Sequence, residues 1–112
     1  MKKYCLYICI IHSMCFSQWF EINFDGVERV YYVSYPSGAS SPSGLIVNMH
    51  GFGGNASSQL SGTQMDTYAH PQNIAVVYPQ GINSDIGYTS WNVGTFWDSN
   101  SEDDVGFISA VI

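Results

Sequence analysis

Basic residues are scarce in this chain. Its 112 residues include only three lysines and arginines, against nine aspartates and glutamates, and the formal net charge is −6. Proteins that bind nucleic acids hold the phosphate backbone with clustered lysines and arginines. We therefore expect no nucleic-acid partner, and an acidic surface that keeps the protein soluble.

A long hydrophobic run is also missing. The chain starts with two lysines, an apolar run over residues 4–11 and small residues up to Ser17, which is the layout of a secretory signal peptide. The run is far shorter than the about 20 apolar residues that cross a bilayer. We expect residues 1–17 to be removed. The mature chain, 18–112, would then be secreted or periplasmic, with no stable membrane anchor.

The mature chain would contain no cysteine, because Cys5, Cys9 and Cys15 all lie in the predicted signal peptide. Disulfides and thiolate metal sites are excluded on that basis, however oxidising the destination. Arg29 would be the only fixed positive charge left. We expect neither a metal nor an organic cofactor.

The start of the mature chain predicts a β-hairpin. Residues 19–24 and 27–35 are rich in aromatic and β-branched residues. Between them, Asp25-Gly26 readily supplies the two positive φ angles of a type I′ turn. Residues 36–44 are mostly Ser, Gly and Pro, so they are predicted to form a loop.

The middle of the chain predicts a strand–helix–strand unit. Residues 45–49 and 74–78 are short apolar runs, typical of strands that are buried on both faces of a parallel sheet. Apolar residues recur at helical spacing over residues 56–69. Pro71 ends that pattern, with His70 at an exposed helix end. Such a unit requires a parallel crossover, so the predicted fold class is α/β.

The last part of the chain begins with a long loop over residues 79–100, rich in Gly, Asn, Ser and aromatic residues. Residues 101–104 (SEDD) match a capping box, so we predict a helix over residues 105–112. We expect Asp103 and Asp104 to cap this helix, near the positive end of its dipole, rather than to act in catalysis. A helix at this position needs a further strand to return to, so the domain is expected to be incomplete.

The glycine-rich stretch after residue 50 has two interpretations. Residues 51–56 fit G-x-G-x-x-A, the fingerprint of a dinucleotide-binding loop. That fingerprint also needs an acidic residue near the end of the next strand, to hold the ribose. Residues 78–80 read Tyr-Pro-Gln instead. The sequence therefore disfavours a dinucleotide.

The other interpretation is one half of an oxyanion hole. Acyl-transfer enzymes stabilise a developing negative charge with preorganised N–H groups. In α/β-hydrolases one such donor lies in the loop after the third strand, which often begins His-Gly. Glycines allow the backbone to approach a substrate closely. We expect the Phe52 N–H to be the donor, and His50, Gly51, Gly53 and Gly54 to support the loop. The His50 ring should hydrogen-bond nearby backbone and not act as the catalytic base.

Five ordered motifs give the chain a resemblance to a known family. They are RVYYV (29–33), IVNMHGFGGNA (46–56), VVYPQG (76–81), SWN (90–92) and DDVGFI (103–108). Over residues 27–112 the chain resembles the N-terminal half of secreted polyhydroxybutyrate-depolymerase-like and feruloyl-esterase-like α/β-hydrolases, the carbohydrate esterase family 1 type. One departure is Ser90, where many relatives carry a cysteine, so a disulfide of those relatives would be absent.

The resemblance implies a secreted serine esterase that hydrolyses carboxylic esters through an acyl-enzyme. Polyhydroxyalkanoates and feruloyl or acetyl polysaccharides are the substrate types that it suggests. The nucleophile of such enzymes lies on a Gly-x-Ser-x-Gly elbow, and the triad's Asp and His follow. No Gly-x-Ser-x-Gly occurs in the 112 residues. We therefore expect the whole triad beyond Ile112, and this chain alone to be inactive.

Trp91 and Asn92 are candidates for the substrate pocket, because ligand sites gather at the carboxyl edge of a parallel sheet. Core packing is an equal alternative for Trp91. A serine peptidase of the same fold is another reading, and so is an exported non-catalytic module that binds a polymer or carbohydrate. The aromatic residues available to such a module are Tyr31, Tyr32, Tyr35, Trp91 and Trp97. The oligomeric state is not indicated.

Overall fold

The computed structural model describes residues 16–94 and 100–112. Most of the predicted signal peptide, and Trp97, lie outside the described residues. In chain order the elements are β1 (Gln18–Phe24), β2 (Val27–Ser34), β3 (Gly44–Val47), α1 (Ala56–Thr63), α2 (Met65–Ala69), the 3₁₀ turn η1 (His70–Gln72), β4 (Ile74–Pro79), β5 (Ile82–Asn83), β6 (Thr89–Ser90) and α3 (Asp104–Val111).

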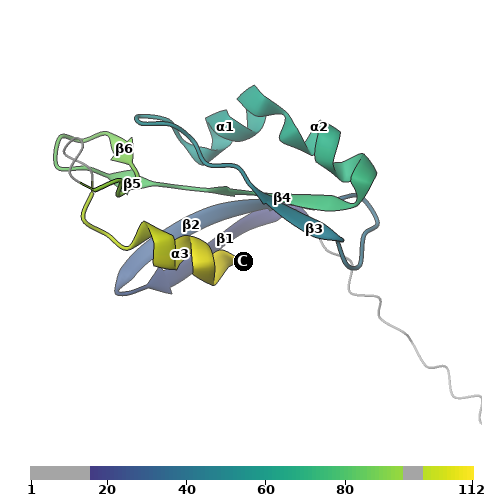
Figure 1. Ribbon diagram of the computed structural model, residues 1–112, viewed down its shortest axis with the longest axis horizontal. Coiled ribbons are helices and arrows are strands. Elements are labelled where there is room, and N and C mark those ends of the chain that lie inside the picture. The colour runs from purple at the N-terminus through teal and green to yellow at the C-terminus, as the bar shows by residue number, and fades with distance from the viewer. Residues whose placement is uncertain (1–15, 95–99) are drawn as a thin grey trace, which may run out of the picture.

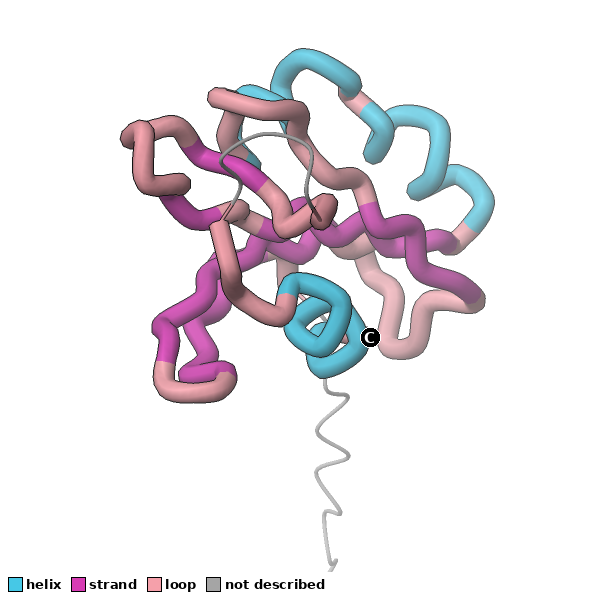
Figure 2. The backbone as a smooth tube through the Cα atoms, turned by 60° about the vertical axis from the view of Figure 1, so that its left-hand side comes forward, coloured by secondary structure: helices cyan, strands magenta, loops and turns pink. Residues whose placement is uncertain are grey.

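A four-stranded mixed sheet forms the centre, with the strand order β1-β2-β4-β3. β1 and β2 are antiparallel, β2 and β4 are antiparallel, and β3 and β4 are parallel. Helices α1 and α2 lie on one face of the sheet and α3 lies on the other, as Figures 1 and 2 show. The predicted α/β class and the parallel strand–helix–strand crossover are therefore confirmed.

The hairpin is confirmed down to its turn. Asp25 has φ 52° and Gly26 has φ 81°, so both central residues have the positive φ that a type I′ turn requires. The Gly26 N–H also donates to the Asn23 side chain at 3.1 Å. The pairing starts with Phe24 opposite Val27 and runs back to Gln18 opposite Val33.

The single helix predicted over residues 56–69 is wrong. The chain breaks at Gln64, which has φ 48° and donates its N–H to the Leu60 carbonyl, so α1 ends in a left-handed cap and α2 starts afresh. Gly62, two residues before the break, favours an end there, because glycine has a low helix propensity. β3, the first strand of the strand–helix–strand unit, is also shorter than predicted: it ends at Val47 rather than Met49.

The core lies on both faces of β4, whose five residues from Ala75 to Pro79 are buried. On the α1 and α2 side the cluster consists of Ala56, Ala69, Val76 and Tyr78, with Tyr32, Ile46, Leu60, Met65 and Ile74 packed against it. On the other side Phe107 of α3 is fully buried and packs edge-on against Tyr31 at 6.4 Å. Burial on both faces explains the unbroken apolar run. No helix within the described ranges has the length and apolarity that crossing a membrane requires.

Candidate functional site

The candidate site lies where the two parallel strands end. The segment 48–55 joins β3 to α1 and contains the residues 50–54, called the glycine loop from here on. Gln80 and Gly81 follow β4 directly. Because β3 and β4 are parallel, their carboxyl ends meet at one edge of the sheet, which brings the two segments together.

The His50 ring joins these two segments. The Gly81 N–H donates to His50 Nε2 at 2.9 Å, so Nε2 must be the nitrogen that carries the lone pair. Nδ1 then carries the proton and donates to the Gly51 carbonyl at 2.8 Å. Only 3% of His50 is exposed. A neutral ring with both nitrogens engaged acts as a brace for the backbone, and its lone pair is not available to take a proton from a nucleophile.

Gly81 must be a glycine for this brace to form. A Cβ at this position would lie 2.6 Å from the Ser90 carbonyl oxygen and 3.1 Å from His50 Cε1 and Nε2. The first distance is shorter than real contacts allow, and a backbone oxygen cannot step aside as a flexible side chain can. The glycine after β4 therefore leaves room for both the imidazole and the Ser90 carbonyl beside the Gly81 backbone.

Gln80 belongs to the site, although it was not predicted from the sequence as a site residue. Its Oε1 accepts the Ala56 N–H at 2.9 Å, at the first turn of α1, and its Nε2 donates to the Gly81 carbonyl at 3.0 Å. Gln80 thus fixes the start of α1 to the end of β4. Two signals for it were its place directly after a buried strand and its place in the VVYPQG motif (76–81).

The hairpin of β5 and β6 fixes the far side of the glycine loop. The Gly53 N–H donates to the Thr89 carbonyl at 2.8 Å, and the Thr89 hydroxyl donates to the Gly54 carbonyl. The Gly54 N–H donates to the Gly51 carbonyl at 3.0 Å. Gly53 has φ 72°, a conformation that glycine adopts without strain. Two of the loop's N–H groups are therefore used to hold its shape.

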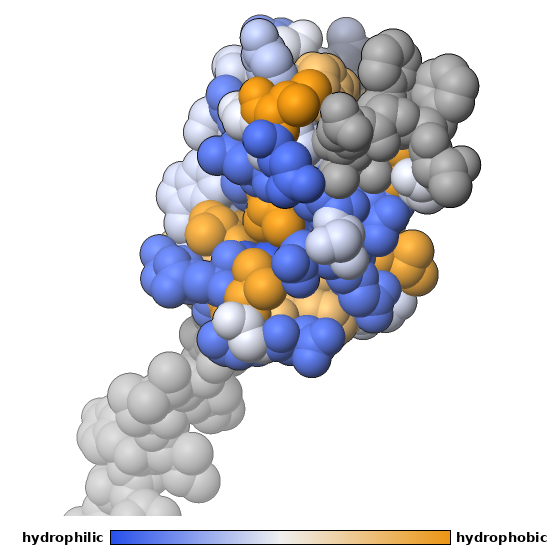
Figure 3. Space-filling model, turned by 90° about the vertical axis from the view of Figure 1, so that its left-hand side faces the viewer, coloured by the Kyte–Doolittle hydropathy of each residue, from blue (hydrophilic) through white to orange (hydrophobic). Residues whose placement is uncertain are grey.

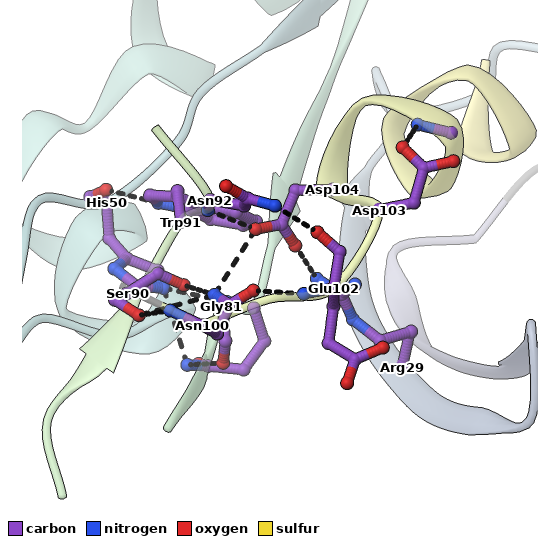
Figure 4. Close-up of polar contacts among 12 residues, drawn as sticks. Arg29, His50, Gly81, Ser90, Trp91, Asn92, Asn100, Glu102, Asp103 and Asp104 are labelled. Carbon is purple, nitrogen blue, oxygen red and sulfur yellow. Dashed lines mark hydrogen bonds and ion pairs between the residues drawn. The ribbon is translucent and has the colours of Figure 1, made fainter. Parts of the chain in front are cut away.

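Trp91, which directly follows β6, supports the glycine loop. Its indole N–H donates to the His50 carbonyl at 2.8 Å, and the two ring centroids lie 5.0 Å apart. Figure 4 shows the indole reaching across to the His50 backbone. Trp91 and Asn92 also line an open apolar groove of about 320 Å³, together with Met49, Val93, Asp104, Val105, Ile108 and Ser109. Phe52 is not among the lining residues, so the two parts of the predicted site do not share this groove.

Asp104 does not cap α3, and the prediction that it does is wrong. Its Oδ1 binds Arg29 Nη2 at 2.6 Å, and the two side chains are 5% and 1% exposed. Its Oδ2 accepts the Asn92 N–H at 2.5 Å and the Asn100 amide at 3.3 Å. The carboxylate points into the molecule because the chain's buried guanidinium lies there, on β2. Asp104 thereby places the Trp91–Asn92 backbone, as Figure 4 shows.

Asp103 caps α3, as predicted. Its carboxylate accepts the Gly106 N–H at 2.9 Å, and the helix begins at the next residue. Asp103 is thus the N-cap, and the capping box predicted to start at Ser101 is wrong by two residues. The reason is that Ser101 and Glu102 belong to the turn that positions Asn100: Asn100 Oδ1 accepts the Glu102 N–H at 3.0 Å.

A serine, a histidine and an aspartate meet elsewhere, on the α2 side of the sheet. Ser34 Oγ donates to Asp66 at 2.6 Å and lies 3.2 Å from His70 Nε2, and the Tyr78 hydroxyl donates to the other oxygen of Asp66. We call these four residues the Ser34 cluster. The carboxylate binds the serine and not the histidine, and Ser34 is only 3% exposed. The order of contacts in a catalytic triad is different.

The Ser34 cluster perturbs one ionisation. Burial, and next the hydrogen bond to the negatively charged Asp66, raise the pKa of Tyr78 to about 12. Tyr78 therefore remains a neutral donor at any physiological pH. The cluster joins β2 and β4 to α2, and its residue types gave no sign of this from their separated places in the sequence.

Comparisons with known proteins add no family to this geometry. No family model matches the chain, and no curated protein matches it either. Within residues 16–94 and 100–112, no group of three or more His, Cys, Asp or Glu side chains is arranged to hold a metal ion. The function must therefore be inferred from the chain's own residues and their geometry.

Proposed function

We propose that this chain is the N-terminal portion of a secreted serine esterase with an α/β-hydrolase fold. In this proposal the glycine loop forms the first half of the oxyanion hole. The single observation that supports it best is the brace by His50, whose neutral ring fixes the loop between β3 and α1 to the end of β4. The loop after the third strand is where α/β-hydrolases carry one oxyanion donor.

A braced loop has the property that oxyanion stabilisation needs. Donors that are already oriented cost no reorganisation when charge develops on the substrate oxygen, and removing one such donor lowers kcat by about 10²–10³. Here the loop is held from three directions: by Gly81 through His50, by Thr89 through Gly53, and by Trp91 through the His50 carbonyl.

We assign the donor to the Phe52 N–H. The N–H groups of Gly53 and Gly54 point to the Thr89 and Gly51 carbonyls, so they serve the loop itself. Phe52 lies at the tip between the His50 brace and these internal bonds, and 55% of the residue is exposed. In this role Gly51 and Gly53 allow a substrate carbonyl to approach the tip without meeting a Cβ.

The mechanism is that of an acyl-enzyme. A serine attacks the ester carbonyl while a histidine takes its proton, and the Phe52 N–H helps to bind the resulting oxyanion. The alcohol leaves with that proton, and a water activated by the histidine releases the acid. Residues beyond Ile112 would supply the triad and the second oxyanion donor. His50 takes no part in proton transfer, since its lone pair is used by Gly81.

The gene beyond codon 112 gives the first test. Completing a loop and a strand of ordinary length after α3 puts a Gly-x-Ser-x-Gly elbow about 20 to 40 residues further on, with Asp and then His after it. The protein from the whole gene should hydrolyse p-nitrophenyl butyrate, and alanine at the elbow serine should abolish that activity. A stop codon after codon 112, or an open frame without the elbow, would exclude the esterase. Cleavage of peptides but not esters would favour the peptidase instead.

The contacts give little support to a sugar-binding module. Tyr31 and Tyr32 are neighbours on β2, so their side chains point to opposite faces. Tyr31 stacks on Phe20 and Tyr32 packs on Trp19, at centroid distances of 5.2 Å in both cases. Thermal unfolding of residues 18–112, expressed alone, distinguishes the binding module from the esterase portion. A self-sufficient module would unfold in one sharp thermal transition, whereas a portion of a larger domain would be molten or insoluble.

A further inference from the structure

Gln18 lies at the start of β1, at an exposed end of the sheet. β1 begins at Gln18, which pairs with Val33 of β2. The predicted cleavage after Ser17 would therefore leave all of β1 in place. In the described part of the chain, it would break the bond in which Ser17 Oγ accepts the Tyr35 N–H at 2.8 Å. Gln18 is exposed, so a new chain end at this residue is accessible to solvent and to enzymes.

We propose that the mature chain begins with Gln18 and that this residue is cyclised to pyroglutamate. The inference rests on the secretion that the proposed function includes, and on no step of ester hydrolysis. In the reaction the free α-amino nitrogen of Gln18 attacks Cδ of its own side chain. The N–Cδ bond forms, the Cδ–Nε2 bond breaks, and Nε2 leaves as ammonia with the proton that the amine gives up. The step changes no oxidation state and needs no co-reactant.

The side chain of glutamine has the length that this ring closure needs. Attack at Cδ gives a five-membered lactam, whereas the shorter side chain of asparagine would give a strained four-membered ring. As long as Ser17 is attached, the Gln18 nitrogen belongs to a peptide bond and its lone pair is delocalised, so it is not a nucleophile. Cleavage converts it into a free amine, which is nucleophilic in its unprotonated form. Removal of the signal peptide thus makes the cyclisation possible at this residue.

The position of β1 in the sheet gives the modification a purpose. β1 lies at the edge in the order β1-β2-β4-β3, so β2 is its only neighbour among the described strands. Trp19, the next residue, packs on Tyr32 at a centroid distance of 5.2 Å, and Tyr32 packs against the core cluster. An aminopeptidase that removed Gln18 and Trp19 would therefore uncover a residue that contacts the core. Aminopeptidases bind a free α-amino group, and the lactam has none.

The other end of β1 has no free chain end. The chain turns at Asp25 and Gly26 and continues directly into β2. Figure 3 shows the end of the molecule that carries this turn, where hydrophobic residues lie in separate patches among hydrophilic ones, as on an ordinary solvent-facing surface. Exopeptidases that act from the amino terminus therefore reach β1 through Gln18, and the protection of this edge strand depends on that residue.

Mass spectrometry of the exported protein tests the modification directly. The protein from the whole gene is isolated after export from its own host, and its N-terminal peptide is sequenced by tandem mass spectrometry directly after harvest. We expect a peptide that starts at residue 18 and is lighter than the unmodified sequence by the mass of one ammonia, with the loss at its first residue. A peptide that starts with unmodified Gln18 would overturn the modification and leave the secretion standing. A peptide that starts at any other residue would overturn both the cleavage after Ser17 and the modification.

Gln18→Asn is the matched variant, because it keeps an exposed amide but cannot close the ring. Its exported form should retain a free α-amino group. Incubation with an aminopeptidase of broad specificity should shorten this variant, whereas the wild type should stay intact until a pyroglutamyl peptidase has removed the lactam. Equal trimming or equal resistance of the two proteins would refute the protective role. Both should hydrolyse esters equally before trimming. A cyclised protein that hydrolyses no ester would refute the esterase and leave the modification standing.

Discussion

Two polar clusters lie on this small sheet, and only one of them holds an exposed backbone loop. The Ser34 cluster contains the residue types of a catalytic triad, yet its contacts run His70, Ser34, Asp66, Tyr78 and are satisfied among themselves. The His50 brace contains a single triad-type residue, and it holds a backbone loop that presents an exposed tip. Residue types therefore say less about function than the direction in which the donors and acceptors point.

The largest expected effect on stability comes from Asp104 of α3, which binds Arg29 and the backbone next to Trp91. Asp104→Ala leaves Arg29 buried without its partner and releases the Asn92 N–H, so it should lower the free energy of unfolding by about 3–5 kcal/mol. Asp103→Ala removes only the N-cap of α3 and should cost about 1 kcal/mol. Urea unfolding of the protein from the whole gene measures both. Equal losses for these neighbouring carboxylates would contradict the assignment of Asp104 to the buried pair.

The brace itself is tested next. Gly81→Ala places a methyl group 2.6 Å from the Ser90 carbonyl, so we expect a loss of about 1–3 kcal/mol in urea unfolding and reduced ester hydrolysis as the loop shifts. Gly62→Ala is the control, since a Cβ at that helical position meets nothing within 4 Å. It should be neutral or stabilise the protein by up to about 1 kcal/mol. If Gly81→Ala were as stable and as active as Gly62→Ala, the close packing of His50 against Gly81 would be wrong.

The Ser34 cluster has its own signature, at alkaline pH. Burial, and next the hydrogen bond to Asp66, raise the pKa of Tyr78 from its ordinary 10.0 to about 12, so the folded state favours the neutral phenol. This contribution is complete below pH 10, declines between pH 10 and 12, and is lost above pH 12. It amounts to about 2–3 kcal/mol, at 1.36 kcal/mol per pKa unit. Urea unfolding at a series of pH values should show this decline in the wild type. Tyr78→Phe should lack it, and an identical decline in Tyr78→Phe would point to another group.

The fold was more predictable from the sequence than the site. Asp25-Gly26 and the apolar runs of β3 and β4 are local signals, and local signals are sufficient for a hairpin and a parallel crossover. The break at Gln64 was missed because helical spacing continues through it, although the backbone there turns left-handed. Helical spacing is judged over a window of many residues, so it cannot reveal that a single residue within the window has a positive φ.

The site depends on contacts between residues that are distant in the sequence. The glycine loop was identified by its His-Gly pattern, but its brace comes from Gly81 and its second support from Trp91, neither of which the pattern contains. Asp104 was misassigned because a carboxylate at a helix start ordinarily caps the helix. Only the position of Arg29 on β2, 75 residues earlier in the chain, turns it inward.

The smallest expected effect on stability comes from Ser34→Ala, and the activity of this variant tests which of the two clusters serves catalysis. Ser34→Ala removes the hydroxyl that lies between Asp66 and His70, while Tyr78 still donates to Asp66. We expect a loss of about 1 kcal/mol in urea unfolding, the ordinary contribution of one hydrogen bond. The hydrolysis of p-nitrophenyl butyrate by the whole gene product should be unchanged. Loss of hydrolysis in Ser34→Ala with the fold intact would reverse the assignment. It would make Ser34 the nucleophile, and the resemblance of the Ser34 cluster to a triad would then outweigh the direction of its hydrogen bonds.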